Sequence, residues 1–426
     1  MRLPISYGAS PVQSATIAFV MENSHPIAAV SRRSLSRRSV VKSAVVATTA
    51  LAVPRLLAQA RPQPAAKRIL VGSGTPDGIL SFAWDEKTGE LRPEAIAAKI
   101  SHSTWLDFSP DRRYLYVASE LDQFEGQPTG AVGSFSFADG KLTPISLVSA
   151  HGAETCHLTT DHTGRVVICA NYGGGSASSF LPKEGKLGQA VWTEHYKGYP
   201  GPGPIPDRQE AAHAHFASVS PDNRFAYIND LGADKIHIYK LNSETGVLAP
   251  AGTYDAKPGD GPRTLHFHKS GKAAYCVNEL NSTVTVLAWS ATDGSLTPIQ
   301  TVPLLPEGTA PKHGDITNTG CDIVLTRDGR FAYFANRGDD FLIGFHIDPG
   351  PGPATGKLTP FEGNPRTSCG GKTPRNFRLD PTERWMLVAN QGSSNLSVFA
   401  RDPKTSHLSN EGKNYPAATP MCIVFV

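Results

Sequence analysis

Residues 261–302 read GPRTLHFHKSGKAAYCVNELNSTVTVLAWSATDGSLTPIQTV, and this stretch decides the fold. It predicts four short β-strands in a row. Residues 265–268 form the first, and a Lys-Ser-Gly-Lys turn separates it from the second at 273–277. The third strand, 282–289, alternates apolar and polar residues, and the Asp293-Gly294 pair that follows is a hairpin signal, because both residues tolerate positive φ. The fourth strand is expected at 295–302.

The last turn of this stretch recurs along the chain. A glycine, or once a serine, stands two residues before a leucine in seven copies, which end at Leu91, Leu142, Leu187, Leu248, Leu296, Leu358 and Leu408. The spacings between these leucines are 51, 45, 61, 48, 62 and 50 residues. Four strands repeated about every 50 residues are typical of a β-propeller blade. The sequence therefore predicts an all-β, seven-bladed β-propeller with four antiparallel strands per blade.

The two ends of the repeat region complement each other. The turn between the first and second strands of a blade is found only six times, because the first blade lacks an inner strand at its own start. Residues 421–426 read as such a strand without the rest of a blade. We expect this C-terminal strand to join the first blade and close the ring, which removes a free sheet edge.

The first 60 residues have a different character. Residues 36–42 read SRRSVVK, which is a twin-arginine pattern, and an apolar run at 44–53 and an Ala-Gln-Ala site at 58–60 follow it. This order predicts an export signal for residues 1–60 and a single propeller domain at 61–426. The apolar run is too short to span a membrane. Met21 is an alternative start, since the residues before it fit no export pattern.

Composition excludes several classes of function. Residues 1–60 hold seven basic residues and one acidic residue, so their removal changes the formal net charge from +3 to −3. Nucleic-acid binding needs a clear basic excess, and no such partner is expected. The six cysteines form no C-x-x-C pair, and most fall in expected core strands. Their spacing does not say whether disulfides form.

Polar residues gather where each inner strand begins and where each second strand ends. Because strand one leaves one face of the disc and strand two returns to it, these positions share one channel mouth. The side chains expected around it are those of His157, His215, Arg263, Glu279, Arg337 and Arg375. Two long insertions, 199–210 and 306–319, precede inner strands and are expected to overhang the same mouth.

Some of these residues also have purely structural interpretations. The asparagine that opens each second-strand exit, such as Asn278, is expected to bond the backbone of its turn. His213 and His215 could hold a metal, but no third ligand is near them in the sequence. The arginines could pair with Glu279 or Asp230 only to join blades, whereas their number favours an anionic or carbonyl-bearing ligand.

Five stretches carry a family resemblance. They are CHLTTDHTGRVVICANYGGGSASSF (156–180), HAHFASVSPDNRFAYINDLGADKI (213–236), GPRTLHFHKSGKAAYCVNELNSTVTV (261–286), GCDIVLTRDGRFAYFANRGDDFL (320–342) and GGKTPRNFRLDPTERWMLVANQGSSNLSVF (370–399). In these stretches the chain resembles the seven-bladed lactonase family, which includes propeller-type 6-phosphogluconolactonases and carboxy-muconate cyclases. The resemblance covers essentially everything after the export signal.

The resemblance implies a lactone site without a metal or other cofactor. The residues proposed for the cyclase branch correspond here to His215, Arg263, Glu279 and Arg337, with His157, His213 and Arg375 expected to bind substrate. Glu279 or His215 can act as base and the other as acid, while the arginines stabilise an oxyanion or hold a carboxylate. We expect Arg263→Ala or Glu279→Ala to abolish lactone opening with thermal unfolding nearly unchanged.

The expected function is hydrolysis of a sugar-acid or related lactone by a periplasmic or secreted enzyme. An exported enzyme does not meet a phosphorylated cytosolic sugar, so the export signal argues against a phosphosugar substrate. A muconate-type lactonising cyclase and a non-catalytic propeller that binds a ligand or a protein are the alternatives. We expect a small-molecule partner, no membrane association after signal cleavage, and a monomer.

Overall fold

The computed structural model describes residues 67–197, 203–313, 316–350, 355–363 and 365–426. These residues form β-strands and connecting turns, with no helix among them. No helix able to span a membrane is therefore found in this part of the chain. The predicted export signal at residues 1–60 lies outside the described residues.

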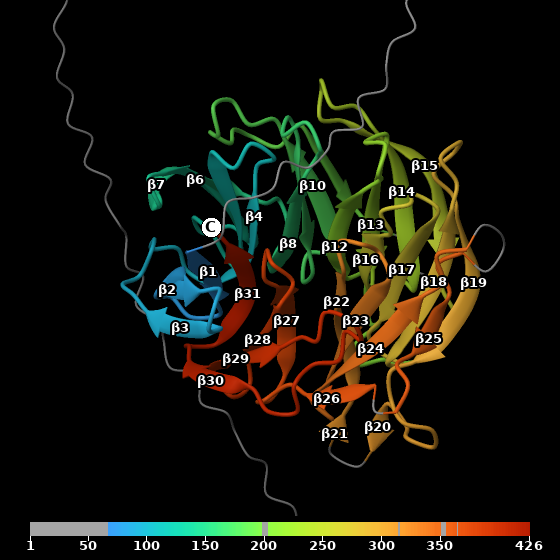
Figure 1. The fold of residues 1–426 in the computed structure, drawn as a ribbon. Coiled ribbons are helices and arrows are strands. Elements are labelled where there is room, and N and C mark those ends of the chain that lie inside the picture. Colours follow the sequence, from blue (N-terminus) through green and yellow to red (C-terminus); the bar gives the residue numbers. More distant parts are fainter. Residues whose placement is uncertain (1–66, 198–202, 314–315, 351–354, 364) are drawn as a thin grey trace, which may run out of the picture. The chain divides into compact units, whose positions relative to one another are not determined.

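Seven sheets of four antiparallel strands follow one another along the chain (Figure 1). The first blade contains β1 (Arg68–Ser73), β2 (Leu80–Asp85), β3 (Glu90–Pro93) and β31 (Pro420–Phe425). The second contains β4 (Ser103–Phe108), β5 (Tyr114–Ser119), β6 (Ala131–Ala138) and β7 (Lys141–Ser149). The third contains β8 (Thr155–Thr160), β9 (Val167–Asn171), β10 (Ser176–Phe180) and β11 (Trp192–His195).

The fourth blade contains β12 (Ala214–Val219), β13 (Phe225–Asp230), β14 (Lys235–Leu241) and β15 (Leu248–Asp255). The fifth, predicted strand by strand above, contains β16 (Pro262–Phe267), β17 (Ala273–Asn278), β18 (Thr283–Trp289) and β19 (Leu296–Pro303). The sixth contains β22 (Thr319–Leu325), β23 (Phe331–Arg337), β24 (Phe341–Ile347) and β25 (Leu358–Pro360), with β26 (Arg366–Ser368) also paired to β24. The seventh contains β27 (Pro374–Leu379), β28 (Trp385–Asn390), β29 (Asn395–Ala400) and β30 (Lys413–Pro416).

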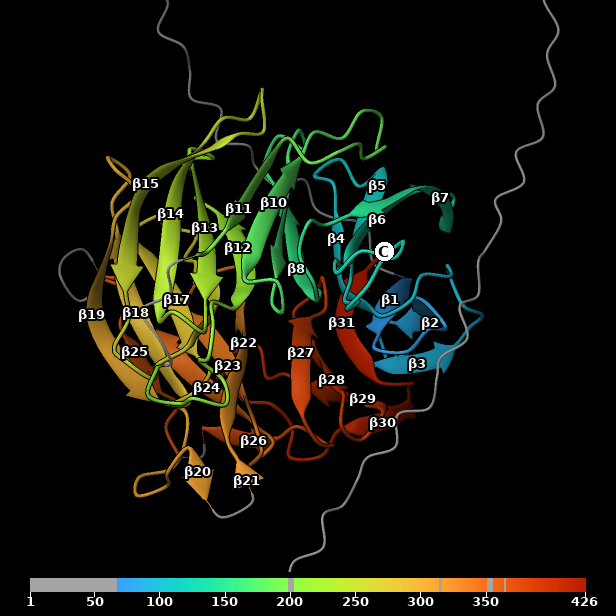
Figure 2. The same ribbon diagram turned by 180° about the vertical axis from the view of Figure 1, so that it is seen from behind.

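The C-terminal strand closes the ring, as the sequence predicts. In both views β31 lies beside β1 (Figures 1 and 2), and the antiparallel pairing runs from Ile69 opposite Phe425 to Gly72 opposite Cys422. Each inner strand also packs beside the inner strand of the next blade, and β31 lies between β27 and β4. The inner strands therefore surround a central channel without a break.

The hydrophobic core lies between neighbouring blades. One cluster, for example, joins Tyr275 and Val286 of the fifth blade to Phe334 and Phe345 of the sixth, all of them fully buried or nearly so. Each sheet packs both of its faces against the neighbouring sheets. This explains why the middle strands are apolar on both faces and why a single blade cannot be stable alone.

Backbone geometry and packing explain the repeated glycine-leucine turn. Gly294 and Gly356 adopt positive φ angles of 80° and 85°, and Ser406 keeps the same conformation at 64°. The carbonyl of each accepts a hydrogen bond from a buried tyrosine of the preceding blade, as in the 3.0 Å contact of Tyr275 Oη with Gly356 O. The leucine that follows is buried in most copies. The motif therefore joins one blade to the next.

A β-bulge interrupts every inner strand close to its start. In each of the seven, the pairing with the second strand skips one residue, or two in β22, as between Ala214 and Phe216 in β12. A bulge leaves the extra residue out of the ladder and re-aims its side chain. The residues within the skipped stretches are Thr104, Cys156, His215, Arg263, Cys321, Arg375 and Met421, together with Asp322 in β22.

Candidate functional site

The bulge residues meet inside the channel. Thr104, Cys156, His215, Arg263, Cys321, Arg375 and Met421 all line one small void of about 20 Å³. They come from all seven blades, and the bulge is what brings them to a common level. We call the end of the channel where the inner strands begin the starting end, and the opposite end the far end.

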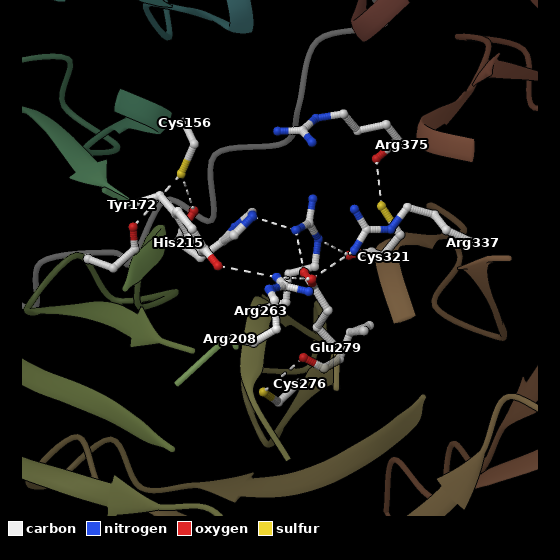
Figure 3. Close-up of polar contacts among 12 residues, drawn as sticks. Cys156, Tyr172, Arg208, His215, Arg263, Cys276, Glu279, Cys321, Arg337 and Arg375 are labelled. Atoms are coloured by element: carbon white, nitrogen blue, oxygen red, sulfur yellow. Dashed lines mark hydrogen bonds and ion pairs between the residues drawn. The ribbon is translucent and has the colours of Figure 1, made fainter. Parts of the chain in front are cut away.

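Glu279 is the centre of the polar contacts at the starting end (Figure 3). It follows β17, and its amide donates to Gly261 O at 2.8 Å, which fixes the turn that carries it. Its Oε1 accepts from Arg208 Nη2 at 2.6 Å and lies 3.0 Å from Arg337 Nη2. Its Oε2 accepts from Arg263 Nη1 at 2.6 Å. One buried carboxylate is therefore bound by three guanidinium groups from three different parts of the chain.

His215 completes this group, which we call the Glu279 cluster: Arg208, His215, Arg263, Glu279 and Arg337. Arg263 Nη1 contacts both Glu279 and Nε2 of His215. Because a guanidinium can only donate, His215 Nε2 is an acceptor and its proton sits on Nδ1. His215 Nδ1 and Arg337 Nε are buried, and neither has a hydrogen-bond partner among the described residues.

Burial and the arginines set the charge states. Burial alone would raise the pKa of Glu279, but Arg337, Arg263 and Arg208 outweigh it and hold that pKa well below its usual value. Burial, reinforced by Arg263, lowers the pKa of His215 well below its usual value. At neutral pH the cluster therefore contains a permanent carboxylate and a neutral imidazole.

Tyr172 and His213 form a wall beside the cluster. The Tyr172 ring stacks on the His213 imidazole with centroids 4.4 Å apart, and its hydroxyl accepts from Arg208 Nη2 at 3.2 Å. His213 also contacts Glu210 at 2.9 Å and the Tyr172 carbonyl at 3.0 Å. His213 and His215 thus contact the same tyrosine ring rather than one shared metal position. The described residues contain no group of three side chains suited to a metal ion.

Arg375 lies at the same level of the channel, in the seventh blade. Its Nη2 is 3.5 Å from Glu120 Oε2, and its carbonyl accepts from the Cys321 thiol at 3.0 Å (Figure 3). The starting end therefore holds four arginines, with the carboxylates of Glu279, Glu120, Glu210 and Glu154 around them. The guanidinium groups can bind an anionic ligand or stabilise a developing negative charge.

His157 lies one position beyond the bulge of β8, which falls on Cys156. It still lines the same small void as His215, Arg263 and Arg375. Its ring stacks on Phe216 with centroids 3.7 Å apart and contacts Trp105 at 4.3 Å. The expected substrate contact of His157 stays a prediction.

Three residues of this region had no role expected from the sequence: Arg208, Tyr172 and Glu120. Arg208 belongs to the insertion at 199–210, for which an overhanging position was expected, and its contact with Glu279 places this part of the loop over the cluster. The other insertion contains β20 (Lys312–His313) and β21 (Ile316–Thr317) and leads to Thr319, which pairs with Arg337. Its overhanging position stays a prediction.

The exit asparagines are buried, but the expected bond to the backbone of their own turns is wrong for Asn278, which donates to the hydroxyls of Thr283 and Thr285. Asn171 and Asn390 each donate to a carbonyl of the segment that enters their blade and to a serine hydroxyl within it. All six cysteines are buried and free.

The chain is similar to several known proteins. A sequence model of the family described as "Lactonase, 7-bladed beta-propeller" matches residues 68–425. The chain belongs to this lactonase family. The 6-phosphogluconolactonase of Bacillus subtilis (strain 168) is 32% identical over 355 residues, which cover 83% of this chain and 95% of that protein.

Solved structures of this family are similar to the chain as well. The periplasmic gluconolactonase PpgL of Pseudomonas aeruginosa has a TM-score of 0.76 at 32% identity, covering 84% of this chain and 98% of that one. A putative 6-phosphogluconolactonase from Bacteroides fragilis has a TM-score of 0.74 at 30% identity, covering 85% and 98%. The resemblance found in the sequence is thereby confirmed.

Proposed function

We propose that this lactonase-family chain hydrolyses a sugar-acid lactone at the Glu279 cluster. The observation that carries the proposal is the contact geometry of Glu279, a buried carboxylate bound by three guanidinium groups beside a neutral imidazole. Several guanidinium groups around one buried carboxylate also occur in structural networks. Here the same group also holds two buried N–H donors, His215 Nδ1 and Arg337 Nε, with no hydrogen-bond partner among the described residues. Such donors suit the place where a tetrahedral oxyanion would form.

Lactone hydrolysis consists of three events that the protein must assist. A water attacks the lactone carbonyl carbon and gives up a proton, the ring C–O bond breaks, and the leaving alkoxide takes a proton to become a hydroxyl. Glu279 is the group that we assign to accept the water's proton. His215 Nε2 is already occupied by Arg263, so we assign His215 the role of a neutral hydrogen-bond donor through Nδ1.

The unpartnered donors suit the oxyanion. His215 Nδ1–H and Arg337 Nε–H are both buried and have no acceptor within the described part of the chain, and a carbonyl oxygen that gains negative charge would supply one. Leaving buried donors unpaired costs about 1–3 kcal/mol each in the free protein. That cost is relieved when the oxyanion forms, so the interaction is stronger in the transition state than before it.

Arg208 controls how basic Glu279 is. Its side chain is 34% exposed, against 6% for Arg263 and 14% for Arg337. We propose that a polar group of the substrate draws Arg208 away from Glu279 Oε1. This frees that oxygen for water and raises the pKa of Glu279, because one of three neighbouring cations has left.

We assign substrate contacts to His213 and Arg375, which lie beside the cluster and at its level of the channel. His157 lines the same small void as His215, Arg263 and Arg375, and a substrate contact is assigned to it as well. A pH-stat assay of proton release tests the function on a panel of lactones, including glucono-1,5-lactone, its 6-phosphate and a carboxymuconolactone, with and without chelator. Muconate formation or consumption instead of sugar-lactone hydrolysis would favour the cyclase, and binding without turnover would favour a non-catalytic propeller.

We also propose that the protein is exported by the twin-arginine route. The pattern at residues 36–42 motivates this, and a periplasmic member of the family is known from Pseudomonas aeruginosa. The test is N-terminal sequencing of the protein from the extracytoplasmic fraction of a twin-arginine-competent bacterium. A mature start near residue 61 is expected, and the double change Arg37→Lys and Arg38→Lys should retain the full chain inside the cell.

A further inference from the structure

A second cavity lies at the far end of the channel, away from the Glu279 cluster. Its volume is about 480 Å³, and its walls come from the later residues of six inner strands. Exposed residues of the turns, Pro221 and Lys269 among them, form its rim, so it opens to solvent. It shares Trp105, His157 and Phe216 with the void of about 20 Å³, which lies between it and the cluster residues His215 and Arg263. We call it the Trp105 cavity.

An aromatic band runs along its wall. Trp105, His157, Phe216 and His266 come from four consecutive blades and contact each other in that order. Their ring centroids are 4.3, 3.7 and 5.3 Å apart. All four residues line the cavity. The rings fix one another, and the Arg378 guanidinium lies over the Trp105 ring, 5.4 Å from its centroid. The parts of the rings that remain open to the cavity form an apolar wall that is rigid before any ligand arrives.

Polar atoms without a hydrogen bond lie beside this band. Ser218 Oγ and His266 Nε2 are buried and have no hydrogen-bond partner among the described residues, and the nearest carboxylate oxygen to His266 Nε2 is Asp322 Oδ1 at 3.8 Å. His157 Nδ1 accepts from the amide of Ala217 at 3.2 Å, so the proton of its neutral form is on Nε2, to which no described residue is bonded. Unpaired polar groups in a wall that is otherwise stacked and packed are a cost in the free protein that a ligand with hydroxyl groups can relieve.

Asp107 supplies an acceptor two residues beyond Trp105 on β4. Its Oδ2 accepts from Thr159 Oγ1 at 3.3 Å and from the amide of Thr160 at 3.2 Å. Burial, only partly offset by these bonds and by Arg378, raises the pKa of Asp107 to about 6.

The charges of the wall nearly cancel. Arg378 donates to Asp322 at 3.0 Å, so these two neutralise each other. Burial lowers the pKa of His157 well below its usual value and that of His266 to about 4, so both imidazoles are neutral at pH 7. One unpaired carboxyl remains. An anionic ligand would meet that carboxyl unfavourably, and a cationic one would meet Arg378.

We propose that the Trp105 cavity is a second ligand site, which binds a neutral pyranose or a similar polyhydroxylated ring. The C–H groups of the ring would contact the parts of Trp105 and Phe216 that line the cavity, while its hydroxyls would bond Asp107, Ser218, His157 Nε2 and His266 Nε2. A cavity of this size is within the usual range of small-molecule sites, about 300–1,000 Å³. The proposal is independent of the lactonase reaction.

Isothermal titration calorimetry of the mature chain with methyl glucoside, methyl galactoside and methyl mannoside tests the proposal. These probes have no lactone group and no charge. Saturable, millimolar binding of at least one of them is expected for the wild type. Asp107→Asn and Trp105→Leu should weaken it at least tenfold, and Ser218→Ala severalfold. Calorimetry is the readout because the loss of Trp105 itself would change the fluorescence.

Arg208→Ala is the matched control, since it alters the starting end of the channel and leaves the far end intact. Unchanged glycoside binding in this variant is expected and places the ligand in the Trp105 cavity. Asp107→Asn is nearly isosteric and keeps the test valid if Trp105→Leu fails to fold. The proposal is overturned by no saturable binding of any of the three glycosides, by binding of gluconate in their place, or by a loss in Arg208→Ala as large as in Asp107→Asn.

Discussion

Arg263 joins Glu279 to His215 through a single atom. Its Nη1 donates to Glu279 Oε2 and to His215 Nε2, while its Nε donates to the carbonyl of Cys321 at 3.0 Å. This arrangement fixes the tautomer of the histidine and the position of the carboxylate at once. It also makes the roles of the two residues distinct, because the imidazole nitrogen that could act as a base is already in use.

The role of His215 as a neutral donor predicts a graded series of variants. His215→Phe removes the Nδ1 donor and should lower kcat/KM about a hundredfold, as for loss of one oxyanion donor. His215→Asn keeps an N–H group and should recover part of the loss. Because the pKa of His215 is depressed, the pH–rate profile of the wild type should show no inflection near pH 6.5. An inflection at that pH that disappears in His215→Asn would show instead that His215 titrates there.

Arg208 should matter for activity far more than for folding. Removing a charge-assisted contact of this kind costs about 1.5–3 kcal/mol, so Arg208→Ala should lower kcat/KM about ten- to a hundredfold. It should also move the acidic limb of the rate profile to higher pH, since Glu279 loses one cation. Arg224→Ala is the control, because Arg224 pairs with Asp222 in an exposed turn. Equal kinetics in the two variants would rule out our assignment.

The fold and most of the cluster could be predicted from the sequence for physical reasons. The glycine-leucine turn recurs because every blade needs the same positive φ and the same buried leucine, and residues at strand starts and exits meet because the blades radiate from one axis. Arg208 could not be found in this way, since its loop has no counterpart in other blades. The place of His157 depended on a one-residue bulge that leaves no mark in the sequence.

The burial of Glu279 changes the expectation that variants of Glu279 and Arg263 keep wild-type stability. Glu279 is 1% exposed and is bound by three arginines, so its removal leaves buried charges without compensation. Breaking such a cluster typically costs about 3–5 kcal/mol. Variants of Glu279 and Arg263 should therefore unfold earlier than wild type, unlike what sequence alone led us to expect, and their activity must be measured on the folded fraction.

The channel should make the protein less stable in acid. His266, with a folded pKa of about 4, stays neutral while the unfolded chain takes up protons below about pH 6.5, so stability falls between pH 6.5 and 4. Its share is on the order of 3 kcal/mol, and His157 and His215 act in the same direction.

Asp107 opposes this fall. Its folded pKa of about 6 lies above the value of about 3.9 for an unfolded aspartate, so the folded state binds the proton first as the pH drops. Asp107→Asn should therefore make the loss of stability between pH 6 and 4 steeper, as measured by urea unfolding across pH. An unchanged slope would mean that Asp107 is ionised throughout this range.

Removal of one hydroxyl group tests how much the blade-joining turn contributes to stability. Tyr275→Phe deletes the donor to Gly356 O and leaves that carbonyl unpaired, so the free energy of unfolding should drop by about 1–2 kcal/mol. Tyr415→Phe is the control, since no described residue bonds the Tyr415 hydroxyl. Equal denaturation midpoints for the two variants would show that the hydrogen bond contributes nothing measurable.

The most direct test of the central claim is the initial rate of proton release from glucono-1,5-lactone, corrected for spontaneous hydrolysis. The chain from residue 61 onward is compared with its Glu279→Gln variant, and the concentration of folded variant is set by circular dichroism. We predict that the wild type accelerates ring opening and that the folded variant is at least about a hundredfold slower. A folded Glu279→Gln protein with wild-type kcat/KM would contradict the account.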